Sequence, residues 1–367
     1  MDNLLSKANI LIRKYRPSDD SSRRINVFQR GNLLQLTFQT NGCRYSVSGS
    51  CTMCNYGQGV ITDAQFILQE LDEICHSKAF VESTMILLGA SGSFLDEGEL
   101  PSKLQYNIMK RISQSHIQEI FIETHYKSVS NEKLQIIQEI FHDKAVHIEM
   151  GLETITEEFQ TNILNKPISL SQLKETIQQI HAHNIVVDLN ILFGMPFLTV
   201  NQQIEDTLKT IRWALENGAD NIILFPINIH PYTVFEWWYD NGLITVPSLW
   251  GLFMVLQNLT DKELSCICLA WYGNRYIAYS PEKKTIIPQA CPACQEQLIS
   301  FFDSFASNYN LSYRKKSLEE FTNRTFHCKC RENLIAEASA EICTDFMFKL
   351  KSAHDTLERW VKEYAGQ

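Results

Sequence analysis

The chain has 367 residues, which is enough for one large catalytic core and a smaller appendage. Its hydrophobic share of 44% excludes a disordered or fibrous protein, and it contains no run of about 18 apolar residues that could cross a membrane. The net charge of -9 argues against a protein whose whole surface grips nucleic acid.

The amino terminus lacks a basic stretch followed by an apolar stretch and a cleavage site, so a cytoplasmic location is expected. In that reducing compartment, eleven cysteines predict metal or cluster ligation rather than a disulfide scaffold. Residues 1–30 form a basic N-terminal arm with seven basic and three acidic side chains. Its arginines could contact an RNA backbone, but the composition favours a solvated, partly mobile segment. The arginines concerned are Arg13, Arg16, Arg23 and Arg24.

Residues 31–259 alternate short apolar runs with longer amphipathic ones, which is typical of repeated β-α units and a parallel sheet. The predicted strands are residues 33–38, 85–88, 117–122, 146–151, 186–193 and 221–225. The predicted helices are residues 64–77, 102–114, 131–141, 170–182 and 200–216. Six such units fit an open, partial (β/α)6 barrel of the α/β class, whose chemistry collects at the carboxyl ends of the strands. A doubly wound sheet is the competing layout.

Residues 260–367 are expected to form a small, cysteine-rich, α-containing C-terminal domain that ends in one long helix over residues 332–364. Two cysteine pairs in this tail match a tetrahedral metal site. Zinc, an auxiliary iron-sulfur cluster and unligated core thiols remain open alternatives. The pairs are Cys291 with Cys294 and Cys328 with Cys330.

A second set of cysteines follows the first predicted strand directly, as Cys43, Cys51 and Cys54 in the spacing Cys-x7-Cys-x2-Cys. A structural zinc site needs a fourth ligand, and no further Cys or His lies nearby in the sequence. Three thiolates are instead enough to hold a [4Fe-4S] cluster with one iron left without a protein ligand. The triplet therefore predicts a reactive cluster at the mouth of the barrel.

This loop resembles the cluster-binding loop of radical S-adenosylmethionine (SAM) enzymes, with a longer first spacing and with Met53 as the hydrophobic residue before the last cysteine. The resemblance implies that the three cysteines ligate the cluster and that SAM chelates the open iron. One electron, from a donor such as flavodoxin or ferredoxin, would then cleave SAM to a 5'-deoxyadenosyl radical that takes hydrogen from the substrate.

Later motifs are similar to the branch of that family that contains the Elongator catalytic subunit and, more closely, the archaeosine enzymes. The similarity covers about residues 30 to 335, and its clearest segments are residues 89–96 (Gly-Ala-Ser-Gly-Ser-Phe-Leu-Asp), 151–154 (Gly-Leu-Glu-Thr), 195–199 (Met-Pro-Phe-Leu-Thr) and 226–230 (Pro-Ile-Asn-Ile-His). It implies a TIM-like radical SAM barrel for residues 31–259.

The same resemblance assigns cofactor contacts to the strand ends. The small residues 89–93 would bind the methionine amino group, Glu123 the ribose or amino end, and Asn190 the adenosine side. The full predicted cofactor-binding set is Met53, Tyr56, Gly89, Ala90, Ser91, Gly92, Ser93, Glu123, Glu153, Asn190 and Gly194. Glu123 and His230 are the candidate catalytic residues, although His230 could equally be a satisfied core histidine.

One departure concerns the third strand, where related enzymes commonly carry Arg-Pro after the glutamate. This chain has Thr124 and His125 there, and a histidine does not replace a bidentate guanidinium. Because the chain is also acidic, a small-molecule substrate, amino-acid-like or a specialised metabolite, is favoured. The alternatives are an archaeosine-type lyase acting on a lysine-modified deazaguanine in tRNA, and a non-enzymatic iron-sulfur carrier in which residues 89–96 would be idle.

Overall fold

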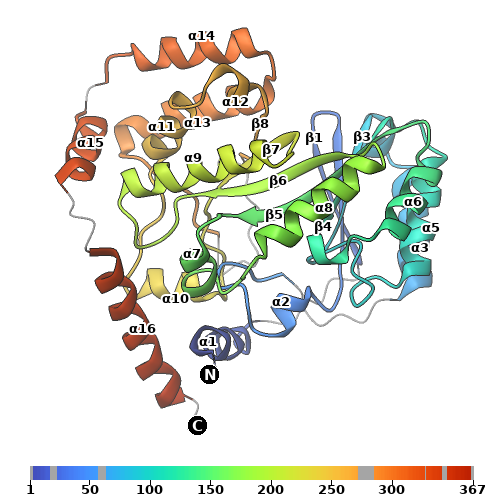
Figure 1. Ribbon diagram of the computed structural model, residues 1–367, viewed down its shortest axis with the longest axis horizontal. Helices are drawn as coiled ribbons and strands as arrows, with labels where there is room; N and C mark the ends of the chain where they lie inside the picture. The colour runs from blue at the N-terminus through green and yellow to red at the C-terminus, as the bar shows by residue number, and fades with distance from the viewer. Residues whose placement is uncertain are drawn as a thin grey trace.

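The computed structural model describes residues 3–16, 23–56, 63–271, 285–326, 328–340 and 345–364. Its centre is an eight-stranded sheet in which the strands follow one another in chain order (Figure 1). The first strand is antiparallel to the second, and all later neighbours are parallel. The strands are β1 (Ile25–Arg30), β2 (Leu33–Phe38), β3 (Met85–Ala90), β4 (Glu119–Thr124), β5 (Ala145–Glu153), β6 (Val186–Phe193), β7 (Asn221–Pro226) and β8 (Ile267–Leu269).

The α/β prediction is confirmed, and so are all six predicted strands, which became β2 to β7. A doubly wound sheet would reverse its strand order at a switch point. Here the order is sequential and, among the described residues, β1 and β8 do not pair with each other, so the sheet is an open, partial barrel. Two strands were missed: β1 lies in the polar arm and β8 has only three residues. Because β8 follows residue 259, the sheet extends past the predicted end of the core.

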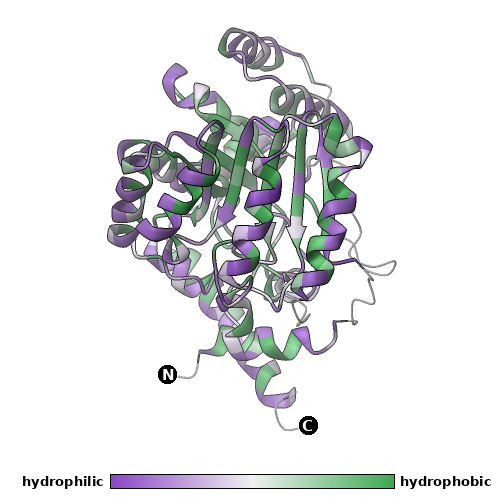
Figure 2. Cartoon of the chain, turned by 90° about the vertical axis from the view of Figure 1, so that its right-hand side faces the viewer, coloured by the Kyte–Doolittle hydropathy of each residue, from purple (hydrophilic) through white to green (hydrophobic). Residues whose placement is uncertain are grey.

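The five predicted helices are present. They are α3 (Ala64–Cys75), α5 (Ser102–Ser113), α6 (Asn131–Ile140), α8 (Leu170–Ala182) and α9 (Val200–Glu216). Their starts follow from the sequence: Thr199 and Gln202 form a reciprocal capping box at α9, and Ser169 caps α8. The strands are mostly hydrophobic and the helices carry both kinds of residue, as a covered sheet requires (Figure 2).

The remaining helices are mostly outside the barrel. They are α1 (Leu4–Arg13), α2 (Arg44–Val47), α4 (Lys78–Val81), η1 (Tyr126–Ser128), α7 (Glu157–Asn162), α10 (Val234–Asp240), α11 (Leu249–Gln257), α12 (Asp261–Ser265), α13 (Pro292–Ser307), α14 (Leu311–Thr322), α15 (Cys330–Ala340) and α16 (Asp345–Tyr364). Where the sequence predicts one tail helix over residues 332–364, two helices, α15 and α16, are described, and residues 341–344 between them lie outside the described part. Within that part, no helix is long and apolar enough to cross a membrane.

The expectation of a solvated N-terminal arm was also wrong, because the arm contributes α1 and β1 to the fold. Helix α1 lies against α16, so both ends of the described chain meet below the sheet in the view of Figure 1. Leu5, Ala8 and Ile12 of α1 join a hydrophobic cluster with residues of α10 and α16 and of the segments after β6 and β7. This second core therefore ties both ends of the described chain to the segments that follow β6 and β7.

Candidate functional site

A cavity of about 310 Å³ opens at the carboxyl ends of the strands, where the barrel argument placed the chemistry. Its lining comes from the loop after β2 and from the ends of β3 to β7. Thirteen of the predicted site residues line it: Cys43, Cys51, Met53, Cys54, Tyr56, Ala90, Ser91, Gly92, Ser93, Glu123, Glu153, Asn190 and His230. Gly89 and Gly194 do not.

All three cysteines of the triplet line this cavity. The Cys51 and Cys54 thiols are hydrogen-bonded to each other. Cys51 has a positive φ of 62°, a backbone conformation that residues other than glycine rarely adopt and that surrounding contacts must stabilise. One such contact is the hydrogen bond of 3.2 Å from the Cys51 N–H to the carbonyl oxygen of Asn165.

Gly89, in β3, and Gly92, in the loop after it, both allow neighbouring side chains to pack closely against the backbone. A Cβ at Gly92 would lie 1.9 Å from the Cβ of Cys43, and one at Gly89 would lie 2.9 Å from a carboxylate oxygen of Glu123. Only a residue without a side chain lets the first cysteine approach β3 this closely. The hydroxyls of the same loop are engaged internally, since Ser93 Oγ accepts from the backbone N–H of His125 at 3.0 Å.

Charged groups line the same cavity. Lys166 Nζ lies 2.7 Å from Glu153 Oε1, and the two side chains are only 13% and 8% exposed. Burial, opposed by the charge of Lys166 and reinforced by that of Glu153, raises the pKa of Glu123 to about 7. Burial and the nearby Glu123 carboxylate raise the pKa of Glu149 well above its ordinary value. Burial is the largest single effect on Lys166 and lowers its pKa, but the charge and hydrogen bond of Glu153, together with the sulfurs of Cys51 and Cys43, outweigh burial and raise the pKa.

Lys166 and Glu149 are cavity residues that the sequence did not predict. Lys166 lies in the loop between α7 and α8, 15 residues after Gly151, and no motif in the sequence marked it. Glu149 carried a weak signal, because it stands two residues before Gly151 in a strand that points alternate side chains into the barrel.

Asn190 and Gly194 have different roles in the structure. The Oδ1 atom of Asn190 is buried and has no hydrogen-bond partner within the described part of the chain. An orphaned acceptor at a cavity wall is costly unless a ligand satisfies it. Gly194 has a positive φ of 97°, and a Cβ there would lie 2.2 Å from Cγ of Pro247. Gly194 therefore serves packing against Pro247.

His230 and Tyr56 lie next to each other at the cavity, with ring centroids 6.1 Å apart. Burial lowers the pKa of His230 to about 4, so its imidazole is neutral at physiological pH. Its Nδ1 atom lies 3.4 Å from the hydroxyl of Thr285. A neutral imidazole can hydrogen-bond a substrate but carries no charge for it.

The departure after the third predicted strand proves to be part of the site. His125 Nδ1 accepts from the backbone N–H of Lys127 at 3.2 Å, and its Nε2 lies 3.0 Å from the hydroxyl of Tyr45. Burial lowers the pKa of His125 to about 2, so the ring is neutral. Arg44 also lines the cavity, and its Nη2 atom lies 2.6 Å from a carboxylate oxygen of Asp96. The sequence analysis did not predict Arg44 as a site residue.

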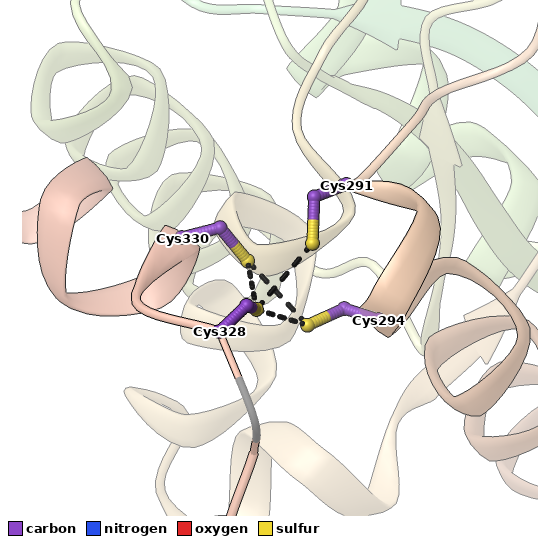
Figure 3. A group of neighbouring side chains, drawn as sticks. All are labelled: Cys291, Cys294, Cys328 and Cys330. Atoms are coloured by element: carbon purple, nitrogen blue, oxygen red, sulfur yellow. Dashed lines mark hydrogen bonds between the residues drawn. The ribbon is translucent and has the colours of Figure 1, made fainter.

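The four tail cysteines converge at a separate place (Figure 3). Their sulfur atoms all lie within 4.8 Å of one another. Cys291 caps α13 and Cys330 begins α15, so the cysteines join two helices. The indole N–H of Trp250 on α11 donates to the sulfur of Cys330 at 3.1 Å. The two cysteine pairs therefore come together in one group, as the sequence predicted.

Comparison with known proteins gives sequence relatives but no matching family model. The archaeosine synthase subunit beta of Methanosarcina acetivorans is 24% identical over 228 residues, which are 61% of this chain and 66% of that protein. The subunit of the same name from Thermococcus kodakarensis is 26% identical over 232 residues, 62% of this chain and 71% of that protein. The chain spans about two thirds of the length of the relatives it matches.

Among solved structures, a queuine lyase from Clostridium spiroforme bound to SAM and queuine is 20% identical with a TM-score of 0.41. The match covers 56% of this chain and 80% of that one. The two sequence relatives confirm the predicted resemblance of this chain to archaeosine enzymes.

Proposed function

We propose that the protein is a radical SAM enzyme whose cluster is held by Cys43, Cys51 and Cys54. The observation that carries this proposal is the opening of all three thiols onto one cavity that also presents a lysine and several carboxylates. A [4Fe-4S] cluster bound there would supply the electron that cleaves SAM into methionine and a 5'-deoxyadenosyl radical, which abstracts hydrogen from the substrate. The chain's own task is to hold and orient both partners.

The charged wall suits the methionine end of SAM. Lys166 offers a largely buried cation for a carboxylate, and it keeps its charge because of Glu153. Glu123 offers an acceptor for an amino group or ribose hydroxyls, and the unpartnered Oδ1 of Asn190 offers another. The apolar side chains of Leu192, Phe225 and Ile227 line the same cavity and can cover the adenine ring.

The favoured substrate is a small molecule. The chain has a net charge of -9, and Arg13 and Arg16 of the basic arm donate to backbone carbonyls of the cysteine loop rather than being free for phosphate. An archaeosine-type lyase that acts on a lysine-modified deazaguanine in tRNA is the second candidate, and the two named relatives favour it. The two are separated by a salt series, since affinity for tRNA falls steeply with ionic strength.

For the tail cysteines we propose one tetrahedral ion, zinc, rather than an auxiliary cluster. Zinc–sulfur bonds of about 2.3 Å place four sulfurs roughly 3.8 Å apart. Four of the six sulfur–sulfur distances in the group are 3.0 to 3.4 Å and all are within 4.8 Å, which is close to that arrangement. A cubane would instead put a different iron behind each thiolate and spread the sulfurs further. Elemental analysis that finds about one zinc per chain, lost in Cys294→Ser, tests this assignment.

The main experiment is anaerobic reconstitution with iron and sulfide, followed by dithionite and SAM. Wild type should form 5'-deoxyadenosine, and Cys54→Ala should not. Cys75→Ala is the matched control, because Cys75 is half-buried on α3 and does not line the cavity. A wild-type protein that binds a cluster but forms no 5'-deoxyadenosine would support the carrier alternative and overturn the enzyme proposal.

A further inference from the structure

Helix α1 lies directly on the cysteine loop, although it belongs to neither the barrel nor the motifs. Asn9 of this helix is fully buried. Its Nδ2 atom lies 3.0, 3.1 and 3.1 Å from the carbonyl oxygens of Gly49, Ser50 and Cys51, so its two N–H groups are shared among these three acceptors. One side chain thus holds three consecutive peptide groups that lead into the second cluster cysteine.

The helix and the loop touch through their backbones at Gly49. A Cβ there would lie 2.6 Å from the carbonyl oxygen of Ser6 and 2.8 Å from Cγ1 of Ile10. Gly49 also has a positive φ of 77°. A side chain at this position would push the loop off the helix, so the contact depends on glycine.

A cation from the same helix reaches the third cluster cysteine. Arg13 Nη2 donates to the carbonyl oxygen of Cys54 at 2.7 Å and lies 3.4 Å from that of Ser50. Positive charge and hydrogen bonds close to a cluster stabilise its reduced, more negative state.

The helix is itself fixed on its other sides. Asn165, whose carbonyl oxygen accepts from the Cys51 N–H, donates through Nδ2 to the hydroxyl of Ser6 at 3.0 Å. The apolar face of α1 is buried with Leu350 and Leu357 of α16. The cysteine loop is therefore held between α1 and the segment after α7, and α16 backs the helix.

We infer that α1 is a brace for the cluster loop, in which Asn9 fixes the loop backbone and Arg13 makes reduction of the cluster easier. Both are positioning residues, because they act through the peptide groups of the cysteine loop and touch neither SAM nor substrate. The inference rests on the proposed function, since it assumes that the loop holds the cluster. It adds a determinant that lies outside the barrel.

The role of Arg13 is tested by the midpoint potential of the cluster, measured in the reconstituted full-length protein. Arg13→Gln should make the potential, measured by EPR-monitored redox titration, more negative than in wild type. Its 5'-deoxyadenosine formation should fall about 10-fold with a limiting reductant, and less with excess dithionite. Lys14→Gln is the matched control: it removes the same charge from the next residue, which is exposed. Equal potentials in the two variants would overturn the role of Arg13.

The test of Asn9 is cluster retention. Asn9→Leu keeps the volume but removes the donors, so iron loss to a chelator should be about 10–100-fold faster than in wild type. Thermal melting of each variant separates a local effect from general unfolding, and retention equal to wild type would overturn the brace. A wild type without a SAM-responsive cluster would sink the proposed function as well, whereas a normal wild type with unaffected variants would sink the brace alone.

Discussion

The buried pair of Lys166 and Glu153 offers a prediction that can be worked out from the structure. The two atoms lie 2.7 Å apart and the side chains are 13% and 8% exposed, so solvent screens the pair weakly. Lys166→Met leaves the Glu153 carboxylate in place without its cation, and it removes the charge that opposes the raised pKa of Glu123. Breaking a buried pair in this way costs about 3–5 kcal/mol.

The assay is urea unfolding of Lys166→Met, of Glu153→Gln and of the double variant. The single lysine variant should lose about 3–5 kcal/mol at neutral pH, and adding Glu153→Gln should recover most of the loss, because neutralising both partners removes the uncompensated charge. Lys174→Met, an exposed lysine on α8, is the control and should stay within about 0.5 kcal/mol of wild type.

Lys166→Met should also bind SAM about 10–100-fold more weakly than wild type, as expected for the loss of one charge-assisted hydrogen bond. This can be measured by equilibrium dialysis of the reconstituted protein. A loss of stability below about 1 kcal/mol in Lys166→Met, with no recovery in the double variant, would refute the reasoning about the buried pair. Unchanged SAM affinity would refute only the role of Lys166 toward the cofactor.

Three further predictions concern other parts of the chain. Gly92→Ala should lower the iron bound per chain after reconstitution, because its Cβ would collide with that of the first cluster cysteine at 1.9 Å; iron content equal to wild type would contradict this. His147 lies 2.9 Å from Asp188 and 3.0 Å from Glu119. Burial lowers its pKa, but these two carboxylates outweigh burial and raise it above the ordinary value. The stability that its charge contributes should therefore be fully present below about pH 6.5 and be lost as pH rises through the raised pKa. The stability difference between wild type and His147→Gln should shrink over that range in urea titrations, and a difference that grows with pH would be inconsistent with the charged triad. Cys294→Ser should release the tail metal and lower the melting temperature, whereas Cys75→Ala should change neither; a metal-free wild type with four reactive tail thiols would contradict the zinc assignment.

The sequence was sufficient for the barrel because its strands are short, apolar and separated by amphipathic helices. The bounds of β2 and β6 agree with the predicted ranges to the residue. In contrast, β8 has three residues, too few for a periodic signal, and β1 is polar on its exposed side. The tail helix was predicted as one element because its apolar spacing continues across residues 341–344.

The site was predictable where a motif stands in one stretch of chain, as in the cysteine loop and the small residues after β3. It was not predictable where the contact is made by tertiary packing alone. Lys166 reaches the cavity from a loop without a motif, and Asn9 and Arg13 reach the cysteine loop from a helix more than 30 residues earlier. Gly194 shows the converse: a motif marked it, yet it lies outside the cavity lining and packs against Pro247, so its cofactor contact stays a prediction.

The central claim is that three thiols leave one iron of a cluster free for SAM. EPR spectroscopy of anaerobically reconstituted, dithionite-reduced protein, recorded with and without SAM, tests this claim most directly. The account predicts a [4Fe-4S] signal that changes shape when SAM is added and that disappears when Cys43, Cys51 and Cys54 are replaced together while the tail cysteines remain. The absence of such a signal, or a signal indifferent to SAM, would contradict it.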